Sequence, residues 1–150
     1  MQTVDLAEIE LLRQESAVID DFKIRVTFPT HAATGSAASA TVYFELEPGM
    51  QLATHRDSAE EILYVIEGEG EAMVGDESGR LRAGQLAVVP SNAPHGIRNV
   101  GKGVLRVLGF FAGSTNISVF DEPFAPGGPQ VIGIGAPIEL SAPMPEPATA

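Results

Sequence analysis

Apolar and polar residues alternate through much of the first 111 residues of the chain. Residues 22–28 (FKIRVTF) place an apolar side chain at every second position, and residues 41–47 (TVYFELE) do so again. A period of two is typical of a strand with one buried face. Strands this short and evenly spaced predict an all-β protein, an antiparallel β-sandwich or barrel. Further β-rich runs, separated by turn residues, lie at residues 61–67, 71–74, 81–83, 86–90, 95–99 and 104–111.

The N-terminal part of the chain has a different pattern. Within residues 5–15, Leu6, Ile9 and Leu12 recur at near-helical spacing, which predicts a short amphipathic helix. Pro29 is expected to end the strand at residues 22–28. The small and polar residues 31–40 are expected to form a flexible loop, with His31 in solvent.

The composition changes again beyond Asp121, where proline, glycine and alanine dominate. This predicts an extended Pro-rich tail with one short strand at residues 130–134. The chain is then one structural domain in three parts. These parts are an N-terminal helix and strand arm (1–39), a barrel core (40–121) and a C-terminal extension (122–150).

Composition narrows the classes of partner and metal site. The chain has 150 residues, with 9 Lys and Arg against 20 Asp and Glu, a net charge of -11 and a pI of about 4.5. Such an acidic chain repels phosphates, so neither nucleic acid nor a membrane surface is an expected partner. There is no cysteine, so a metal must bind through nitrogen and oxygen. With no signal-peptide pattern and no apolar run of membrane-spanning length, we expect a cytoplasmic protein.

The candidate chemistry lies in two segments. Residues 49–68 (GMQLATHRDSAEEILYVIEG) contain His55, Asp57 and Glu61. The first two share a parity, so an extended strand projects both from one face, and Glu61 joins them if a short turn intervenes. Residues 84–99 (GQLAVVPSNAPHGIRN) add His95. Two histidines with one or two carboxylates suit a first-row divalent ion with coordination positions open for substrate.

These two segments resemble the paired motifs of the cupins, G(X)5HXH(X)3-4E(X)6G and G(X)5PXG(X)2H(X)3N. The resemblance covers roughly residues 40 to 112. It implies a jelly-roll β-barrel that holds one divalent metal ion through His55, Glu61 and His95. It also implies a homodimer, with residues 22–28 and the tail expected to cross between subunits. The anchor residues that match are Gly49, His55, Glu61, Gly68, Gly84, Pro90, His95 and Asn99.

Two positions depart from the cupin pattern. Asn92 replaces the second glycine of the second motif, and asparagine tolerates the left-handed turn geometry for which glycine is used. Asp57 stands where the family usually has its second histidine. It is either a fourth metal ligand or a group that holds a water or a substrate hydroxyl. A bound, ionised Asp57 beside Glu61 neutralises a divalent ion, which favours iron(II) or manganese(II), with zinc and nickel as alternatives.

Three classes of function follow for a small organic substrate. The set of two histidines and one carboxylate favours a metal-dependent enzyme of dioxygenase type, an oxidoreductase. The alternative is an isomerase, lyase or cyclase on a carbonyl or sugar-like substrate, with Asp57 or Glu61 as the catalytic proton shuttle. The third is a binding cupin without turnover. Candidate walls of the pocket are Tyr43, Met50, Phe110 and Phe111.

Overall fold

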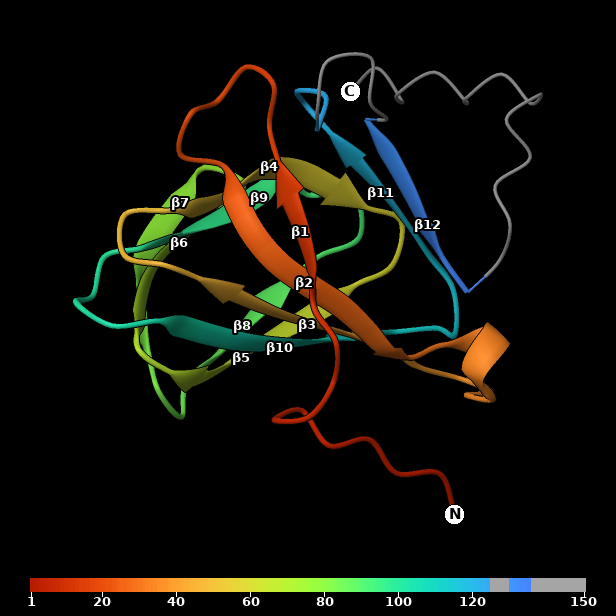
Figure 1. The fold of residues 1–150 in the computed structure, drawn as a ribbon. Helices are drawn as coiled ribbons and strands as arrows, with labels where there is room; N and C mark the ends of the chain where they lie inside the picture. Colours follow the sequence, from red (N-terminus) through yellow and green to blue (C-terminus); the bar gives the residue numbers. More distant parts are fainter. Residues whose placement is uncertain (125–129, 136–150) are drawn as a thin grey trace, which may run out of the picture.

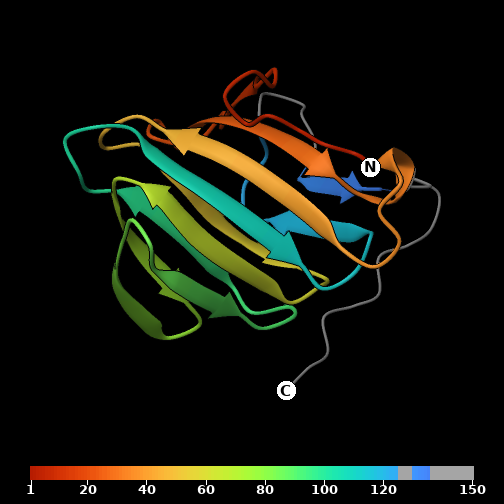
Figure 2. The ribbon, with the colours of Figure 1, turned by 90° about the horizontal axis from the view of Figure 1, so that it is seen from below.

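The computed structural model describes residues 1–124 and 130–135, and these form two six-stranded antiparallel sheets (Figures 1 and 2). The first sheet has the order β1-β2-β3-β10-β5-β8, and the second β12-β11-β4-β9-β6-β7. The predicted all-β antiparallel sandwich is confirmed. The elements in chain order are β1 (Leu12–Glu15), β2 (Lys23–Thr30), the 3-10 helix η1 (Ala32–Thr34), β3 (Ala40–Leu46), β4 (Gln51–Asp57), β5 (Glu61–Glu67), β6 (Glu69–Val74), β7 (Glu77–Arg82), β8 (Leu86–Val89), β9 (His95–Asn99), β10 (Leu105–Phe111), β11 (Asn116–Phe120) and β12 (Val131–Ile134).

The core lies between the two sheets and follows the alternation of the sequence. In the first sheet, β3, β10 and β5 lie side by side (Figure 2) and send alternate apolar residues inward. Phe44 on β3 and Val107 on β10 are opposite each other in register, and both are fully buried. Burial of a side chain of this size stabilises the fold by about 1.5–3 kcal/mol.

The predicted N-terminal helix is wrong. Residues 6–9 form only a turn, in which the backbone N–H groups of Glu8 and Ile9 donate to the carbonyl of Asp5. Residues Leu12–Glu15 are strand β1, paired antiparallel with β2. A helix of about three turns is marginal in water without a face to bury, whereas the edge of β2 offers a partner for the backbone. Leu12 is 60% exposed in this strand, so the expected apolar stripe is not a buried face.

Pro29 does not end its strand, contrary to the prediction. Strand β2 continues to Thr30, and its register with β3 shifts between Thr27 and Thr30. A proline has no N–H to donate, and such an irregularity is where a strand tolerates it. The following loop contains η1, and His31 at its start is half-buried rather than in solvent.

Strand β11 was not predicted, although it is an inner strand of the second sheet. It lies between β12 and β4, and Figure 1 shows β11 and β12 side by side. The short strand expected at residues 130–134 is present as β12. The remaining tail expected at residues 136–150 lies outside the described residues. The three-part division of the domain stays a prediction.

No helix among residues 1–124 and 130–135 is long and apolar enough to span a membrane. The cytoplasmic location stays a prediction.

Candidate metal centre

The two motif segments meet between the sheets. His55 and Asp57 end β4 on its inward face, as their shared parity predicted. Glu61 begins β5 in the opposite sheet, and His95 begins β9, directly opposite His55 in register. All four side chains are buried, with exposed fractions of 2–4%. The structure therefore brings together every residue that the sequence proposed for the metal.

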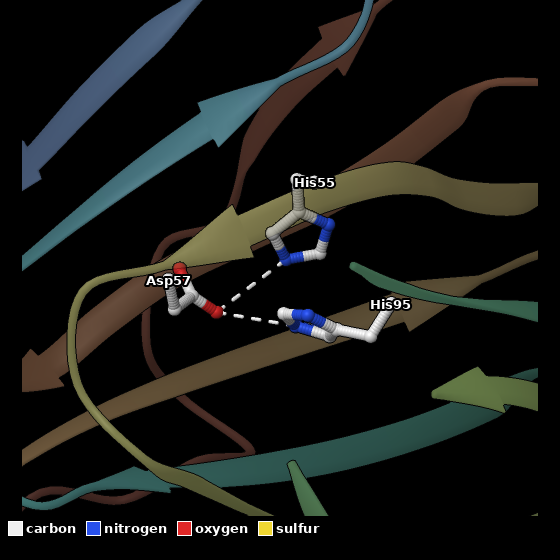
Figure 3. Close-up of side chains that lie close together, drawn as sticks. All are labelled: His55, Asp57 and His95. Carbon is white, nitrogen blue, oxygen red and sulfur yellow. Dashed lines mark ion pairs between the residues drawn. The ribbon is translucent and has the colours of Figure 1, made fainter. Parts of the chain in front are cut away.

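Asp57 faces both histidine rings (Figure 3). Its Oδ2 lies 3.2 Å from Nε2 of His95 and 3.6 Å from Nε2 of His55. One ligand atom from each of these three residues lies within 4.8 Å of the others, close enough to share one ion. Glu61 adjoins the group, with Oε2 3.3 Å from Nε2 of His95.

Backbone carbonyls orient both histidine rings. Nδ1 of His55 is 2.8 Å from the carbonyl of Ala53, and Nδ1 of His95 is 3.0 Å from that of Ala93. Because a carbonyl only accepts, each Nδ1 carries a proton and donates it. In the neutral rings, each Nε2 then presents a lone pair to the site, as metal-ligating histidines do.

The buried atoms at the centre lack hydrogen bonds, and this tests whether a metal fits. With the His95 ring neutral, neither Oδ2 of Asp57 nor Nε2 of His95 has a hydrogen-bond partner, although both are buried and close together. Buried polar atoms are rarely left in this state. A second proton on His95 or a metal ion would each satisfy both atoms. Imidazole nitrogen and carboxylate oxygen are suitable donors for a first-row divalent ion. The residues present therefore fit a divalent metal ion.

The two carboxyl groups have opposite pKa shifts. Burial opposes ionisation of Asp57, but contacts with His55 and His95 outweigh it and hold the pKa of this carboxyl well below its usual range. For Glu61, burial raises the pKa, the charge of Asp57 adds to the effect, and the contact with His95 only partly offsets it. Asp57 is thus the anionic carboxyl of the pair, and Glu61 is the one that more readily holds a proton.

The pKa of His95 is also shifted. Burial alone would lower it, but contacts with Asp57 and Glu61 outweigh burial and raise the pKa to about 10. In the metal-free protein this ring holds a second proton at neutral pH. A metal ion that binds Nε2 must displace that proton.

A glycine makes room for Glu61. Gly109 on β10 lies so close to Glu61 that a Cβ added there would meet its carboxylate oxygen Oε1 and the side chain of Val42. The position therefore requires a residue without a side chain.

Strand β11 supplies the contacts that the sequence prediction missed. Asn116 Nδ2 donates to Oδ1 of Asp57 at 2.8 Å, and the Ser118 hydroxyl donates to the same oxygen at 2.5 Å. Phe120 stacks on the His55 ring, with centroids 4.5 Å apart and an interplanar angle of 14°. Phe111 and Phe120 are also walls of the adjoining cavity.

This cavity, of about 50 Å³, borders the site and is mostly apolar. Neither lysine nor arginine is among its described lining residues. Of the four predicted wall residues only Phe111 lines it. Its lining is Gln14, Ile24, Val26, Phe28, Val42, Phe44, Leu52, His55, Asp57, Glu61, Phe111, Ser118, Phe120, Phe124 and Ile132.

Residues 42–111 match the family model described as the cupin domain. The chain therefore contains a cupin domain. Solved structures that share the fold include a predicted oxalate decarboxylase from Thermotoga maritima, with a TM-score of 0.66 and 23% identity over 75% of this cupin and 99% of that chain. Another is the polyketide cyclase RemF from Streptomyces resistomycificus, with a TM-score of 0.61 and 19% identity over 74% and 78% of the two chains.

A curated relative is named polyketide synthase CurC and comes from Streptomyces cyaneus. It is 31% identical over 108 residues, which cover 71% of this cupin and 66% of that relative. This cupin therefore spans slightly less than two thirds of the length of CurC.

The structure shows how Asn92 and Asp57, the two departures from the cupin motifs, are accommodated. Asn92 has φ of 61° and is the one non-glycine residue with positive φ among residues 1–124 and 130–135. It thus adopts the left-handed geometry that the motif glycine would provide, as predicted. Asp57 is fully buried beside the two histidines, so it is not a solvated turn residue.

Neither Asn99 of the second motif nor the predicted wall residue Tyr43 lines the cavity. Asn99 donates through Nδ2 to the carbonyls of Leu46 and Gly103, and so fixes the end of β9. Tyr43 lies on the far face of the first sheet, where its hydroxyl donates to Glu45 at 2.7 Å, which is why it does not line the cavity.

Proposed function

We propose that this cupin binds one divalent metal ion through His55, Asp57 and His95 and acts as a cyclase on an apolar carbonyl substrate. The observation that carries the proposal is a pair of neighbouring buried carboxyls that line an apolar cavity, with Asp57 among the grouped ligands and Glu61 beside them. Their pKa values are shifted in opposite directions. In such a pair, the carboxyl with the lowered pKa stabilises charge and the carboxyl with the raised pKa transfers a proton. As in the sequence-based prediction, iron or manganese is favoured, and zinc and nickel are the alternatives.

Each residue then has a distinct role. Asp57, His55 and His95 hold the ion, which when bound supplies Lewis acidity toward a carbonyl oxygen. Glu61 starts as a carboxylate, and its raised pKa makes it the stronger base of the two. It takes a proton from the carbon next to a carbonyl and returns it to the oxygen that gains charge as the ring closes. The phenylalanine walls exclude water from the reacting end of the substrate. That Glu61 is also a metal ligand stays a prediction. Its ionised carboxylate is the form that would bind the ion.

The cavity lining supports this choice over oxalate chemistry, although several of the similar solved structures are named oxalate decarboxylase or oxalate oxidase. Among the proteins similar to this cupin, one is named a polyketide synthase and another a polyketide cyclase. Oxalate, the substrate in the name of the Thermotoga maritima protein, is a dianion. The described lining offers no lysine or arginine to neutralise it and already contains two carboxyl groups. A neutral, apolar substrate suits these walls better.

Replacement of Glu61 by Gln tests the proton-transfer role. The probe is a linear diketone that closes to a six-membered cyclic hydroxyketone, which then loses water to give an enone. The absorbance of the enone follows the reaction. Glu61→Gln should lower the rate constant by about 10²–10⁴-fold. The Gln side chain cannot accept the proton, but it nearly conserves the volume. Metal content is measured in parallel, so that loss of the ion is not mistaken for loss of proton transfer.

The matched control is Glu60→Gln, since Glu60 is exposed and adjacent in sequence. It should leave the rate unchanged. Equal rates for the wild-type protein and Glu61→Gln, with metal bound in both, would exclude the proposed role.

A dioxygenase is the second candidate, and one observation favours it. Two histidines with a carboxylate are the ligand set of non-haem iron oxygenases, and here they lie within bonding range of one site. Oxygen uptake by the iron-loaded protein with an aromatic diol would support this function. Ring closure of the diketone without oxygen would support the cyclase. Tight binding of either probe with no turnover would support a binding cupin instead.

We also propose that this cupin forms a homodimer through the outer face of β5, β8 and β10. Two cross-strand rows cover this face, Phe110–Ile62–Val88 and Leu108–Tyr64–Leu86. Four of these apolar side chains are 37–61% exposed. The rows contain no charged residue, so two copies related by a two-fold axis can pack there although each chain is acidic. Strand β2, which the sequence placed at the interface, is instead paired on both sides within the chain.

A further inference from the structure

The register of β11 against β4 places its inward residues on the metal centre. Ser118 is directly opposite Asp57, and Phe120 is directly opposite His55. Asn116, two residues before Ser118, points to the same side, and all three are buried. One strand therefore contacts two of the three grouped ligands.

The two oxygens of Asp57 have different surroundings. Oδ1 accepts hydrogen bonds from Asn116 and Ser118, whereas Oδ2 has no hydrogen-bond partner and faces the two histidines. Contacts to the other end of the Asn116 amide maintain this difference between the two Asp57 oxygens. The amide oxygen of Asn116 accepts from the backbone N–H of Ala59 at 3.0 Å and from the Ser58 hydroxyl at 3.2 Å. These contacts fix which end of the amide faces Asp57, namely its NH₂ group.

We infer that Asn116 and Ser118 are positioning residues that restrict Asp57 to binding the metal ion through Oδ2 alone. A carboxylate can bind a metal through one or both oxygens. Two hydrogen bonds to Oδ1 hold that oxygen away from the ion, which keeps a coordination position free for substrate. The inference rests on the proposed metal site and adds to it the number of oxygens that Asp57 contributes.

Manganese(II) binding to the full chain tests this inference. Ser118→Ala removes one hydrogen bond to Oδ1 and should weaken manganese affinity about 10- to 100-fold. It should also shift the carboxylate infrared bands of the manganese form toward those of a two-oxygen ligand. Asp57→Asn identifies which bands belong to Asp57. The thermal midpoint of the metal-free variant shows whether it remains folded.

Two further variants separate positioning from packing. Ser118→Thr keeps the hydroxyl and should restore most of the affinity. Ile117→Ala shortens an exposed side chain on the opposite face of β11, away from Asp57, and should bind manganese like the wild type.

The possible failures can be told apart. A wild-type protein that binds none of manganese, iron, zinc and nickel overturns the metal site and the inference with it. A wild-type protein that binds manganese, with equal affinity and bands in a folded Ser118→Ala, overturns the inference alone. Equal losses in Ser118→Ala and Ile117→Ala would do the same, because they would reflect general packing of the strand.

Discussion

Gly109 offers a way to disturb Glu61 without touching the grouped ligands. A methyl group at this position meets the carboxylate of Glu61 and the side chain of Val42. Gly109→Ala should displace Glu61 and lower the rate of diketone cyclisation at least tenfold, while metal content stays near one equivalent. Gly103→Ala is the control, since an added Cβ there meets no neighbouring atom within 4 Å. Full activity in Gly109→Ala would show that the position of the Glu61 carboxylate does not matter.

His95 makes metal binding depend on pH. Its pKa is raised to about 10 in the metal-free protein, so the ring carries an extra proton at pH 7 that the metal must displace. Affinity should therefore increase with pH, by about tenfold per unit between pH 7 and 9, and should fall as the pH is lowered. Calorimetric titration in buffers of different ionisation enthalpy measures the protons released. The expected value is about one per ion at pH 8, and zero would contradict the raised pKa.

At the scale of elements, the turn before β9 supports the site through its backbone. The N–H of Asn92 donates to the carbonyl of Asp57 at 2.8 Å, and this turn requires positive φ. Asn92→Gly should leave the free energy of unfolding within about 0.5 kcal/mol of the wild type. Asn92→Val should lower it by about 1–2 kcal/mol, because a β-branched residue is strained at positive φ. Urea unfolding measures both, and equal stabilities would contradict the turn geometry.

The alternation of apolar and polar residues within each strand explains why some strands were predicted and β11 was not. The strands Glu61–Glu67 and His95–Asn99 were predicted with their observed bounds, because each sends alternate residues into the core and is bounded by turn residues. In β11 the alternation runs the other way. Polar Asn116 and Ser118 face inward while apolar Ile117 and Val119 do not, so a search for inward apolar residues misses it. The polar residues are buried because they bind Asp57.

The grouping of His55, Asp57, Glu61 and His95 was largely predictable from strand parity and motif spacing. His55 and Asp57 follow from parity on one strand, and the motif spacing adds Glu61 and His95. What the sequence could not settle was whether Asp57 reaches the histidines, since that depends on the register of β4 against β9 and β11. These pairings join segments that are far apart in the chain, and local pattern contains no information about them.

At the scale of the whole molecule, the apolar outer face predicts a homodimer. Phe110→Glu places a charge at 42% exposure within the apolar rows and should shift the protein from dimer to monomer at micromolar concentration. Sedimentation velocity measures the change. Ile117→Glu, on β11 of the other sheet, is a control of similar exposure at 43%. A wild-type protein that sediments as a monomer at this concentration would contradict the proposed dimer.

The most direct test of the metal centre is anomalous diffraction, at the absorption edges of iron, manganese, nickel and zinc, from crystals of protein purified without chelator. The account predicts a single metal peak in contact with Nε2 of His55, Nε2 of His95 and Oδ2 of Asp57. The same map shows whether Glu61 is bound or free. A site that stays empty after soaking with these ions, or a metal bound with Asp57 turned away from it, would contradict the account.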